Sequence, residues 1–180
     1  MGQFVDRMIR ASKLDAHLYE EVEADKGAMG QAMGVVVLSS VAGGVGFMQV
    51  AGPMGLLIGT IGSLLSWYIW ALLTYLIGTK LLPESQTHSD HGELLRTIGF
   101  SSAPGVIRVL AFFPGIANFV NFVASIWMLI AMVIAVRQAL DYQSTYRAIG
   151  VCVIGWIVQA VLLWVLVMMT GGVPELRLNP

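Results

Sequence analysis

The chain has 180 residues, of which 57% are hydrophobic and only 12% are charged, and its formal net charge at pH 7 is -1. Water-soluble domains carry about 25% charged residues, so this composition, with a mean hydropathy of +0.77, excludes an ordinary soluble globule. The near-neutral charge also argues against a nucleic-acid partner. The sequence therefore predicts one all-α domain whose main solvent is the lipid bilayer.

Residues 1–26 carry many charges and are expected to lie outside the membrane as two short helices. Apolar residues recur at helical spacing while basic residues face elsewhere, which predicts an amphipathic helix on the anionic surface of the cytoplasmic leaflet. Ser12 and Asp15 have the form of a capping box, so the second helix is expected to begin there. The apolar residues are Phe4, Val5, Met8 and Ile9, and the basic ones are Arg7, Arg10 and Lys13.

The second predicted helix carries an aromatic residue and an acidic group that are candidates for docking a protein partner. The simpler alternative is a solvated acidic face on a helix that only leads the chain into the membrane. The candidate docking residues are Tyr19, Glu20, Glu21, Glu23 and Asp25.

Five apolar segments follow, and each is expected to cross the bilayer, which needs roughly 20 apolar residues per helix. The first two form a hairpin, because no Asp, Glu, Lys or Arg occurs between Gly27 and Thr79 and the dipeptide Gly52-Pro53 lies at its midpoint. The third is short and contains Pro104, Gly105 and Arg108, so a re-entrant or kinked helix is the alternative there. The predicted spans are residues 28–51, 54–77, 97–113, 116–136 and 148–169.

Basic residues are distributed unequally between the two ends of these spans. Eight Lys and Arg residues precede the first span or lie in the second and fourth loops, whereas Arg177 alone lies beyond the fifth span. Basic loops are retained in the cytoplasm, so the N-terminus is expected to be cytoplasmic and residues 171–180 to form a short tail outside.

Polar residues inside the spans are the next candidates for function. Arg108 has no acidic residue in any of the five segments, so it needs amide oxygens, exposed carbonyls or an anionic lipid as a partner, or else it extends to the membrane surface. Asn118 and Asn121 lie one turn apart on one helix face, where they either hydrogen-bond to a neighbouring helix or line a polar path.

Catalytic and metal-binding patterns fail on inspection. The segment from His88 to His91 has metal-ligand residue types but no third ligand group at a recognised spacing. No serine has a histidine or lysine at a comparable depth to activate it. No cofactor motif is present, and Cys152 lies in an apolar run where a small buried side chain is expected. We therefore expect neither an enzyme nor a bound metal or cofactor.

Several motifs resemble the bacterial members of the Yip1 family. The acidic segment at residues 14–25, followed by Gly30 and Gln31, is similar to the opening of such proteins. Gly99, Phe100 and Pro104 resemble the Gly-Tyr-x-x-x-Pro element of the family's third helix, and residues 127–137 resemble its fourth. The resemblance implies a five-helix membrane domain at residues 27–170 with a cytoplasmic N-terminus, in a bacterial cytoplasmic membrane.

What the resemblance implies about partners is narrower. Eukaryotic Yip1 relatives associate with prenylated Rab GTPases, helped by a cytoplasmic Asp-Leu-Tyr-Gly-Pro element. This chain lacks that element, because Tyr19 is followed by Glu20 and Glu21, and Phe100 replaces the tyrosine of the other motif. The expected function is therefore a non-catalytic membrane protein that organises the membrane or partner proteins. The alternative is a small transporter, channel or lipid-handling protein with a polar path near Arg108, Asn118 and Asn121. The sequence does not predict an oligomeric state.

Overall fold

A computed structural model describes residues 2–44, 48–113 and 115–169, and all regular elements in these ranges are helices. Four of them are long and apolar enough to cross a membrane by length and composition, at Lys26–Gly44, Gly52–Leu81, Ala117–Ala139 and Thr145–Met169. These four correspond to the first, second, fourth and fifth predicted spans. The predicted tail at residues 171–180 lies outside the described residues.

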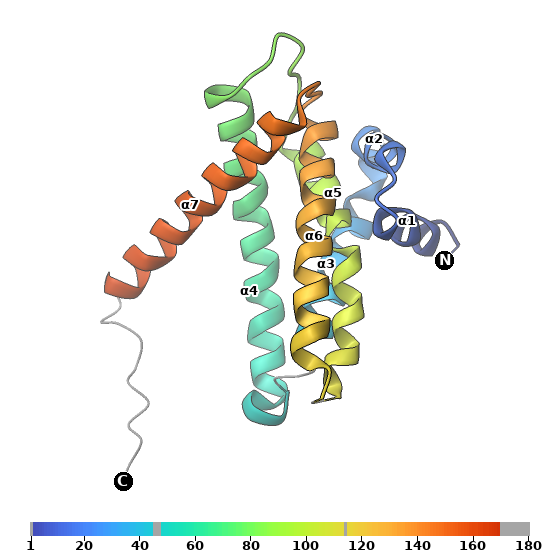
Figure 1. Ribbon diagram of the computed structural model, residues 1–180, viewed down its shortest axis with the longest axis vertical. Coiled ribbons are helices and arrows are strands. Elements are labelled where there is room, and N and C mark those ends of the chain that lie inside the picture. Colours follow the sequence, from blue (N-terminus) through green and yellow to red (C-terminus); the bar gives the residue numbers. More distant parts are fainter. Residues whose placement is uncertain (1, 45–47, 114, 170–180) are drawn as a thin grey trace.

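The two N-terminal helices are α1 (Gly2–Ser12) and α2 (Ala16–Ala24), and they lie against one side of the bundle (Figure 1). The turn between them places Leu14 at φ 62°. Asp15 is the N-cap of α2, and its side chain accepts a hydrogen bond from the backbone N–H of His17 at 3.1 Å. The predicted capping box at Ser12 is therefore wrong, because Ser12 ends α1 and its carbonyl accepts a hydrogen bond from the Trp127 indole at 2.8 Å.

The predicted hairpin consists of α3 (Met29–Gly44), which follows the short η1 helix (Lys26–Ala28), and α4 (Met48–Leu76). The chain breaks at the predicted point, because Gly52 has φ 63° and ψ -172° inside α4, just before Pro53. A residue with a side chain is strained at such a φ, so glycine suits this break. Helix α4 continues into the π-helical segment η3 (Ile77–Leu81).

The third predicted span is not one continuous helix. Helix α5 (His91–Ser101) begins with a capping box between Asp90 and Glu93 and ends just before η4, a 3₁₀ helix at Ala103–Phe112. Pro104 has no N–H to donate and disfavours α-helical geometry in the residue before it, which explains the change of helix type. Together α5 and η4 run along the bundle from the end where α4 finishes to the end where α6 begins (Figure 1).

The last two long helices are α6 (Ala117–Ala139) and α7 (Thr145–Met169). The turn between them packs onto η3, where the Tyr142 hydroxyl donates a hydrogen bond to the carbonyl of Gly78 or Leu82, at 2.9 and 2.7 Å. Glu84 accepts a hydrogen bond from the backbone N–H of Gln143 at 3.0 Å. From this end, α7 leaves the bundle at an angle (Figure 1).

Buried apolar side chains form two clusters. One joins α1, α2 and α3 to Phe100, Ala103 and Ala135. The other joins the end of α4 to α5 and to the α6–α7 turn, around Leu94 and Leu140. Large apolar side chains on the outer faces of α4, α6 and α7 remain exposed, such as Ile58, Phe119 and Trp156, and suit contact with lipid tails.

Charged residues gather at one end of the bundle. Within the described ranges, every Asp, Glu, Lys and Arg except Arg108 lies in residues 6–26, 80–96 or 137–147. Hydrogen bonds join these three segments, from Arg96 to the Val22 carbonyl, from Gln138 to Glu20 and from Arg147 to the Pro83 carbonyl. This charged end therefore holds nearly all the charged groups from which a functional surface of the described residues can be built.

Candidate functional site

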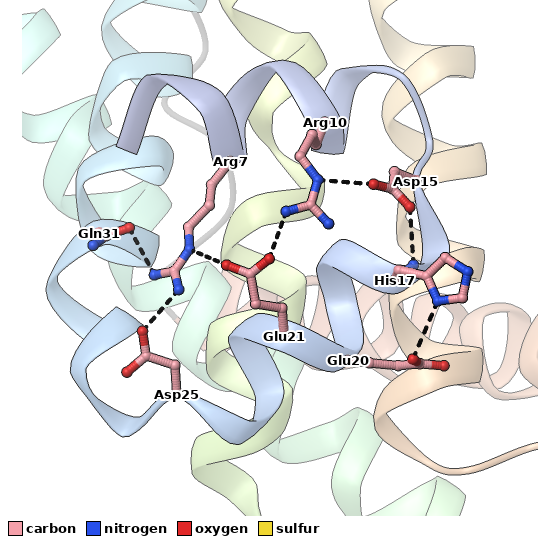
Figure 2. Close-up of polar contacts among 8 residues, drawn as sticks. All are labelled: Arg7, Arg10, Asp15, His17, Glu20, Glu21, Asp25 and Gln31. Carbon is pink, nitrogen blue, oxygen red and sulfur yellow. Dashed lines mark hydrogen bonds and ion pairs between the residues drawn. The ribbon is translucent and has the colours of Figure 1, made fainter. Parts of the chain in front are cut away.

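A cluster of ion pairs links α1 to α2 and to the first span. Arg7 is only 2% exposed, and its guanidinium donates to Glu21 at 2.9 Å and to Asp25 at 2.9 Å (Figure 2). Its third contact is the Gln31 side-chain oxygen at 3.1 Å. Arg10 extends the same network from the next turn of α1, to Asp15 at 2.8 Å and to Glu21. We call Arg7, Arg10, Asp15, Glu21, Asp25 and Gln31 the Arg7 cluster.

The electrostatics of the Arg7 cluster favour the charged form of every member that titrates. Burial alone would lower the pKa of Arg7, but the hydrogen bonds and charges of Glu21 and Asp25 outweigh it and raise the pKa. Hydrogen bonds from Arg10 and Arg7 hold the pKa of Glu21 below its ordinary value. The pKa of Asp25 is lowered by the Arg7 hydrogen bond and by the Gly27 N–H. A buried guanidinium with two carboxylate partners is the arrangement in which arginine is tolerated out of water.

This geometry differs from the basic membrane-facing surface expected for α1. Arg7 points into the protein and Arg10 is paired, so only Lys13 among the three basic residues remains exposed. Val5 and Ile9 are about half exposed, at 50% and 48%, on the outer side of α1. The sequence pattern located the amphipathic helix but assigned its arginines to the wrong face, because α2 supplies carboxylates on the inner side.

The structure separates the five residues predicted to dock a partner. Tyr19 is fully buried in the core, and Glu21 and Asp25 belong to the Arg7 cluster. Glu20 is exposed, with its carboxylate near His17 and within 2.8 Å of the Gln138 amide nitrogen (Figure 2 shows the His17 contact). Glu20 is thus the member of this set that a partner reaches most easily.

A shallow hollow of about 260 Å³ lies beside Glu20. Its walls come from the middle of α2, the last turn of α6 and the α6–α7 turn, and they consist of Glu20, Arg137, Gln138, Asp141 and Tyr142. Two carboxylates, one guanidinium and one neutral amide therefore surround this open depression. No sequence pattern predicts this hollow, since Glu20 and Asp141 are far apart along the chain and meet only through the packing of α2 on α6.

Glu23 occupies a more buried position on the same helix. Burial raises its pKa to about 7, and the negative charges of Glu93 and Asp141 act in the same direction against the opposing charge of Arg96. The Arg96 guanidinium donates to the carbonyls of Val22 and Glu23 at the end of α2, the first at 2.9 Å. Arg96 therefore attaches α2 to α5 through the helix carbonyls that lack intrahelical partners.

The three motif residues of the third segment have packing roles. Gly99 lies against α3 so closely that an added Cβ would be 2.7 Å from the Cβ of Ala32. Phe100 is fully buried among the residues that join α2, α3 and α5. Pro104 is buried at the start of η4. These residues bring α3, α5 and η4 together and contribute no reactive group.

Arg108 lies on η4, and its side chain runs between α3 and α6. Its Cδ atom would be 3.6 Å from a Cβ on Gly43, and its terminal nitrogen donates to the Ser125 hydroxyl at 3.1 Å. The Ser125 hydroxyl in turn donates to the carbonyl of Asn121 at 2.8 Å. The Nε of Arg108 is buried and has no hydrogen-bond partner among the described atoms. The side chains of Asn118 and Asn121 are exposed on the outer face of α6.

The Yip1 domain matches residues 23–167, about four fifths of the chain, which include the four long apolar helices except the last two residues of α7. The chain belongs to the Yip1 family. No curated protein and no solved structure is significantly similar to it. The Yip1 assignment establishes an integral membrane protein of a family that is generally not enzymatic.

The Arg7 cluster bridges the boundary of the Yip1 domain. Arg7, Arg10, Asp15 and Glu21 precede the matched residues, whereas Asp25 and Gln31 belong to them. The cluster thus holds an N-terminal two-helix segment onto the Yip1 domain. The sequence pattern placed Arg7 and Arg10 on the membrane-facing surface and did not pair them with the acidic residues. The four oppositely charged pairs that the two adjacent helices can form were a signal for this cluster.

Proposed function

We propose that this protein is a non-catalytic Yip1-type membrane protein that organises partner proteins through its charged end. The observation that carries the proposal is the concentration of all described charges except Arg108 at that end, around the hollow beside Glu20. The charged groups of the Arg7 cluster are paired with one another, and the Cys152 thiol is buried, so these groups have structural roles. A surface with exposed charges of both signs suits a transient protein contact.

We further propose five membrane crossings, with α5 and η4 forming an interrupted third one. At a rise of about 1.5 Å per α-helical residue and 2.0 Å per 3₁₀ residue, the two elements extend for roughly 36 Å, enough for a hydrocarbon core of about 30 Å. Residues 91–101 are covered on most sides by other helices, which explains why they need not be as apolar as a lipid-facing span.

The charged end is proposed to face the cytoplasm of a bacterial cell. Eight of the nine Lys and Arg residues in the described ranges lie there, and the turn at the opposite end has none. Retention of basic segments in the cytoplasm supports this orientation. The acidic segment at residues 14–25, which has no Asp-Leu-Tyr-Gly-Pro element, supports a bacterial cytoplasmic membrane over a Golgi membrane.

The placement of the intramembrane asparagines argues against a polar path for transport. Asn118 and Asn121 face outward from α6, and Arg108 reaches the same outer side through Ser125. A path would require these groups to line a space between helices. Transport therefore has no particular observation in its favour.

Photo-cross-linking in living cells tests the partner proposal. A photoreactive amino acid at Glu20 or Asp141 is expected to give the same discrete protein adduct, because both positions border the hollow. The matched control is the same amino acid at Ile61, which is 51% exposed on α4 and should react with lipid. The charge reversal Arg137→Glu should reduce the adduct at position 20 without lowering the protein level. The absence of a protein adduct at both hollow positions, together with solute flux in liposomes, would contradict the proposal.

A further inference from the structure

Arg108 is a cation placed far from the other charges. It lies four residues before Phe112, the last residue of η4, and therefore about 8 Å along the helix from the uncharged end. Its one described partner is the neutral Ser125 hydroxyl. A guanidinium at this depth costs several kcal/mol unless an anion or a wet environment compensates it. No acidic group of the described residues lies in this half of the bundle.

Close packing of η4 against α3 and α6 directs the Arg108 guanidinium toward the outer face of α6. Gly105 and Arg108 are three residues apart and so share one face of the 3₁₀ helix. At the level of Gly105, an added Cβ would clash with Ser39 of α3 and Met128 of α6, so the three helices are in close contact. One turn farther along, the stem of Arg108 lies over Gly43, and its head reaches Ser125 on the exposed side. The guanidinium thus has hydrogen-bond donors left over at a lipid-facing surface.

Three polar residues connect this position to the nearby membrane surface. Asn118, Asn121 and Ser125 are exposed and fall on the same side of α6, where lipid tails would otherwise meet apolar groups. Ser125 lies eight residues, or about 12 Å, from Ala117 at the start of the helix. No side chain caps that start, so its backbone N–H groups add a partial positive charge.

We propose that Arg108, Ser125, Asn121 and Asn118 form a binding site for the phosphate group of an anionic phospholipid from the leaflet opposite the charged end. The guanidinium presents several N–H donors in a fork that matches phosphate oxygens. The asparagine amides and the uncapped start of α6 provide further donors along the route to the surface. Exposure to the lipid phase favours a headgroup over a dissolved anion, because a headgroup arrives with acyl chains that cover the apolar residues of α6.

This site is separate from the partner surface of the proposed function, so the two proposals can fail independently. The test uses the full chain in phosphatidylcholine nanodiscs that contain a small fraction of phosphatidylglycerol, with bound lipid counted by native mass spectrometry after detergent release. Wild type is expected to retain phosphatidylglycerol, and Arg108→Gln to retain about tenfold less. Lys80→Gln removes an exposed charge at the other end and is the matched control that should retain as much as wild type.

Further variants keep the result interpretable if Arg108→Gln is unstable. Ser125→Ala and the double variant Asn118→Ala/Asn121→Ala remove only surface hydroxyl or amide groups and should each reduce retention while the thermal midpoint in lipid-free detergent stays unchanged. Arg108→Lys should give an intermediate value, since it keeps the charge but loses the fork. Equal retention by wild type, Arg108→Gln and Ser125→Ala would overturn the proposal.

Two additional experiments determine whether the occupant of the site is a lipid headgroup, a dissolved anion or a second copy of the chain. Inorganic phosphate alone should neither raise the thermal midpoint of wild type in detergent nor displace bound phosphatidylglycerol. If it does both, the ligand is a dissolved anion and the lipid assignment is wrong. A pair of Asn118→Cys chains that cross-links equally with and without phosphatidylglycerol would instead assign this face to a second copy of the chain and also overturn the proposal.

Discussion

At the scale of single residues, Arg7 decides whether the N-terminal helices stay on the bundle. Replacement by leucine would leave Glu21 and Asp25 without their cation and would remove the contact to Gln31. Loss of one partner from a buried pair costs about 3–5 kcal/mol and loss from an exposed pair less than about 1. Because both carboxylates are partly exposed, we expect Arg7→Leu to destabilise the docked state of α1 by about 1–3 kcal/mol.

Hydrogen–deuterium exchange of residues 2–24 measures this effect. Arg7→Leu should raise exchange in α1 and α2 while the spans stay protected, whereas Lys13→Leu, on the exposed side of α1, should leave exchange unchanged. If α1 and α2 remain as protected in Arg7→Leu as in wild type, the hydrophobic contacts of Leu18, Tyr19 and Val22 hold these helices without the cluster.

Glu23 makes the attachment of α2 sensitive to pH near neutrality. Its pKa in the folded protein is about 7, above the ordinary value of 4.5, so the folded state binds a proton that the unfolded state releases. This contribution is fully present below pH 4.5 and is lost as the pH rises through 7. The groups facing Glu23 are Glu20, Glu93, Asp141 and Arg96.

Glu23→Gln should therefore make α2 protection nearly independent of pH between 5 and 8, whereas wild type is expected to lose protection as the pH rises from 5 to 7. Proteolysis of the α1–α2 segment across this range is the measurement. The carboxylates of the Arg7 cluster respond in the opposite sense, because their lowered pKa values make their contribution disappear only in acid. A wild-type profile that stays flat from pH 5 to 8 would show that Glu23 ionises without cost in the folded protein.

At the scale of the elements, close contact between α3 and α5 depends on Gly99. A side chain at this position would approach the Ala32 Cβ at 2.7 Å and the Ala32 backbone at 3.2 Å, and neither can move easily. We expect Gly99→Ala to lower stability by about 1–3 kcal/mol, the usual range for overpacking. Thermal unfolding in detergent, followed by tryptophan fluorescence, should show a lower midpoint.

A compensating substitution separates packing from a backbone effect. Ala32→Gly combined with Gly99→Ala should recover part of the lost midpoint, because the pair is in direct contact. Gly62→Ala is the matched control, since an added Cβ at Gly62 meets nothing within 4 Å. If Gly62→Ala lowers the midpoint as much as Gly99→Ala does, the loss does not come from the contact with Ala32.

The sequence predicted the four long helices but left the third segment open between a full span and a re-entrant or kinked helix. Lipid forces an apolar stretch to be helical, so four long helices could be located from hydropathy and from the Gly52-Pro53 break. Helix α5 is covered by protein and carries Glu93 and Arg96, and therefore gave no strong apolar signal at its start. Its observed beginning at His91 lies six residues before the predicted one, whereas the break near Pro104 agrees with the kinked helix that the sequence left as the alternative.

The candidate sites were predictable only in part. Arg108 could be found because a charge in an apolar run is conspicuous, and hydropathy alone located it. Its Ser125 partner was missed because a hydroxyl is common in spans and the seam between η4 and α6 is a tertiary feature. The hollow beside Glu20 was missed for the same reason, since its members come from α2, the end of α6 and the α6–α7 turn.

At the scale of the whole molecule, the three charged segments at residues 6–26, 80–96 and 137–147 should lie on the cytoplasmic side. In a chain with Cys152→Ala, single substitutions Lys13→Cys, His88→Cys and Ser144→Cys are expected to resist a membrane-impermeant thiol reagent in intact cells and to react after permeabilisation. Gly115→Cys, in the turn at the opposite end, should react in intact cells. Labelling of His88→Cys but not of Gly115→Cys from outside would reverse the proposed orientation.

The length of the second span implies that the protein has two hydrophobic cores, one shielded from water and the other packed within the lipid. Gly52–Leu81 has 30 residues and measures about 45 Å, some 15 Å more than the hydrocarbon layer. Its far end is surrounded by Glu84, Tyr142 and the α6–α7 turn, so Ile77 and Leu140 are buried there from water and not from lipid. The hydrophobic effect stabilises a core that is shielded from water, and this stabilisation weakens in the cold or in urea. Helix packing within lipid depends instead on close van der Waals contact, and urea dissolved in water does not reach it. Cold or urea should thus loosen the end of α4 and the α6–α7 turn while α3, η4 and α6 stay assembled.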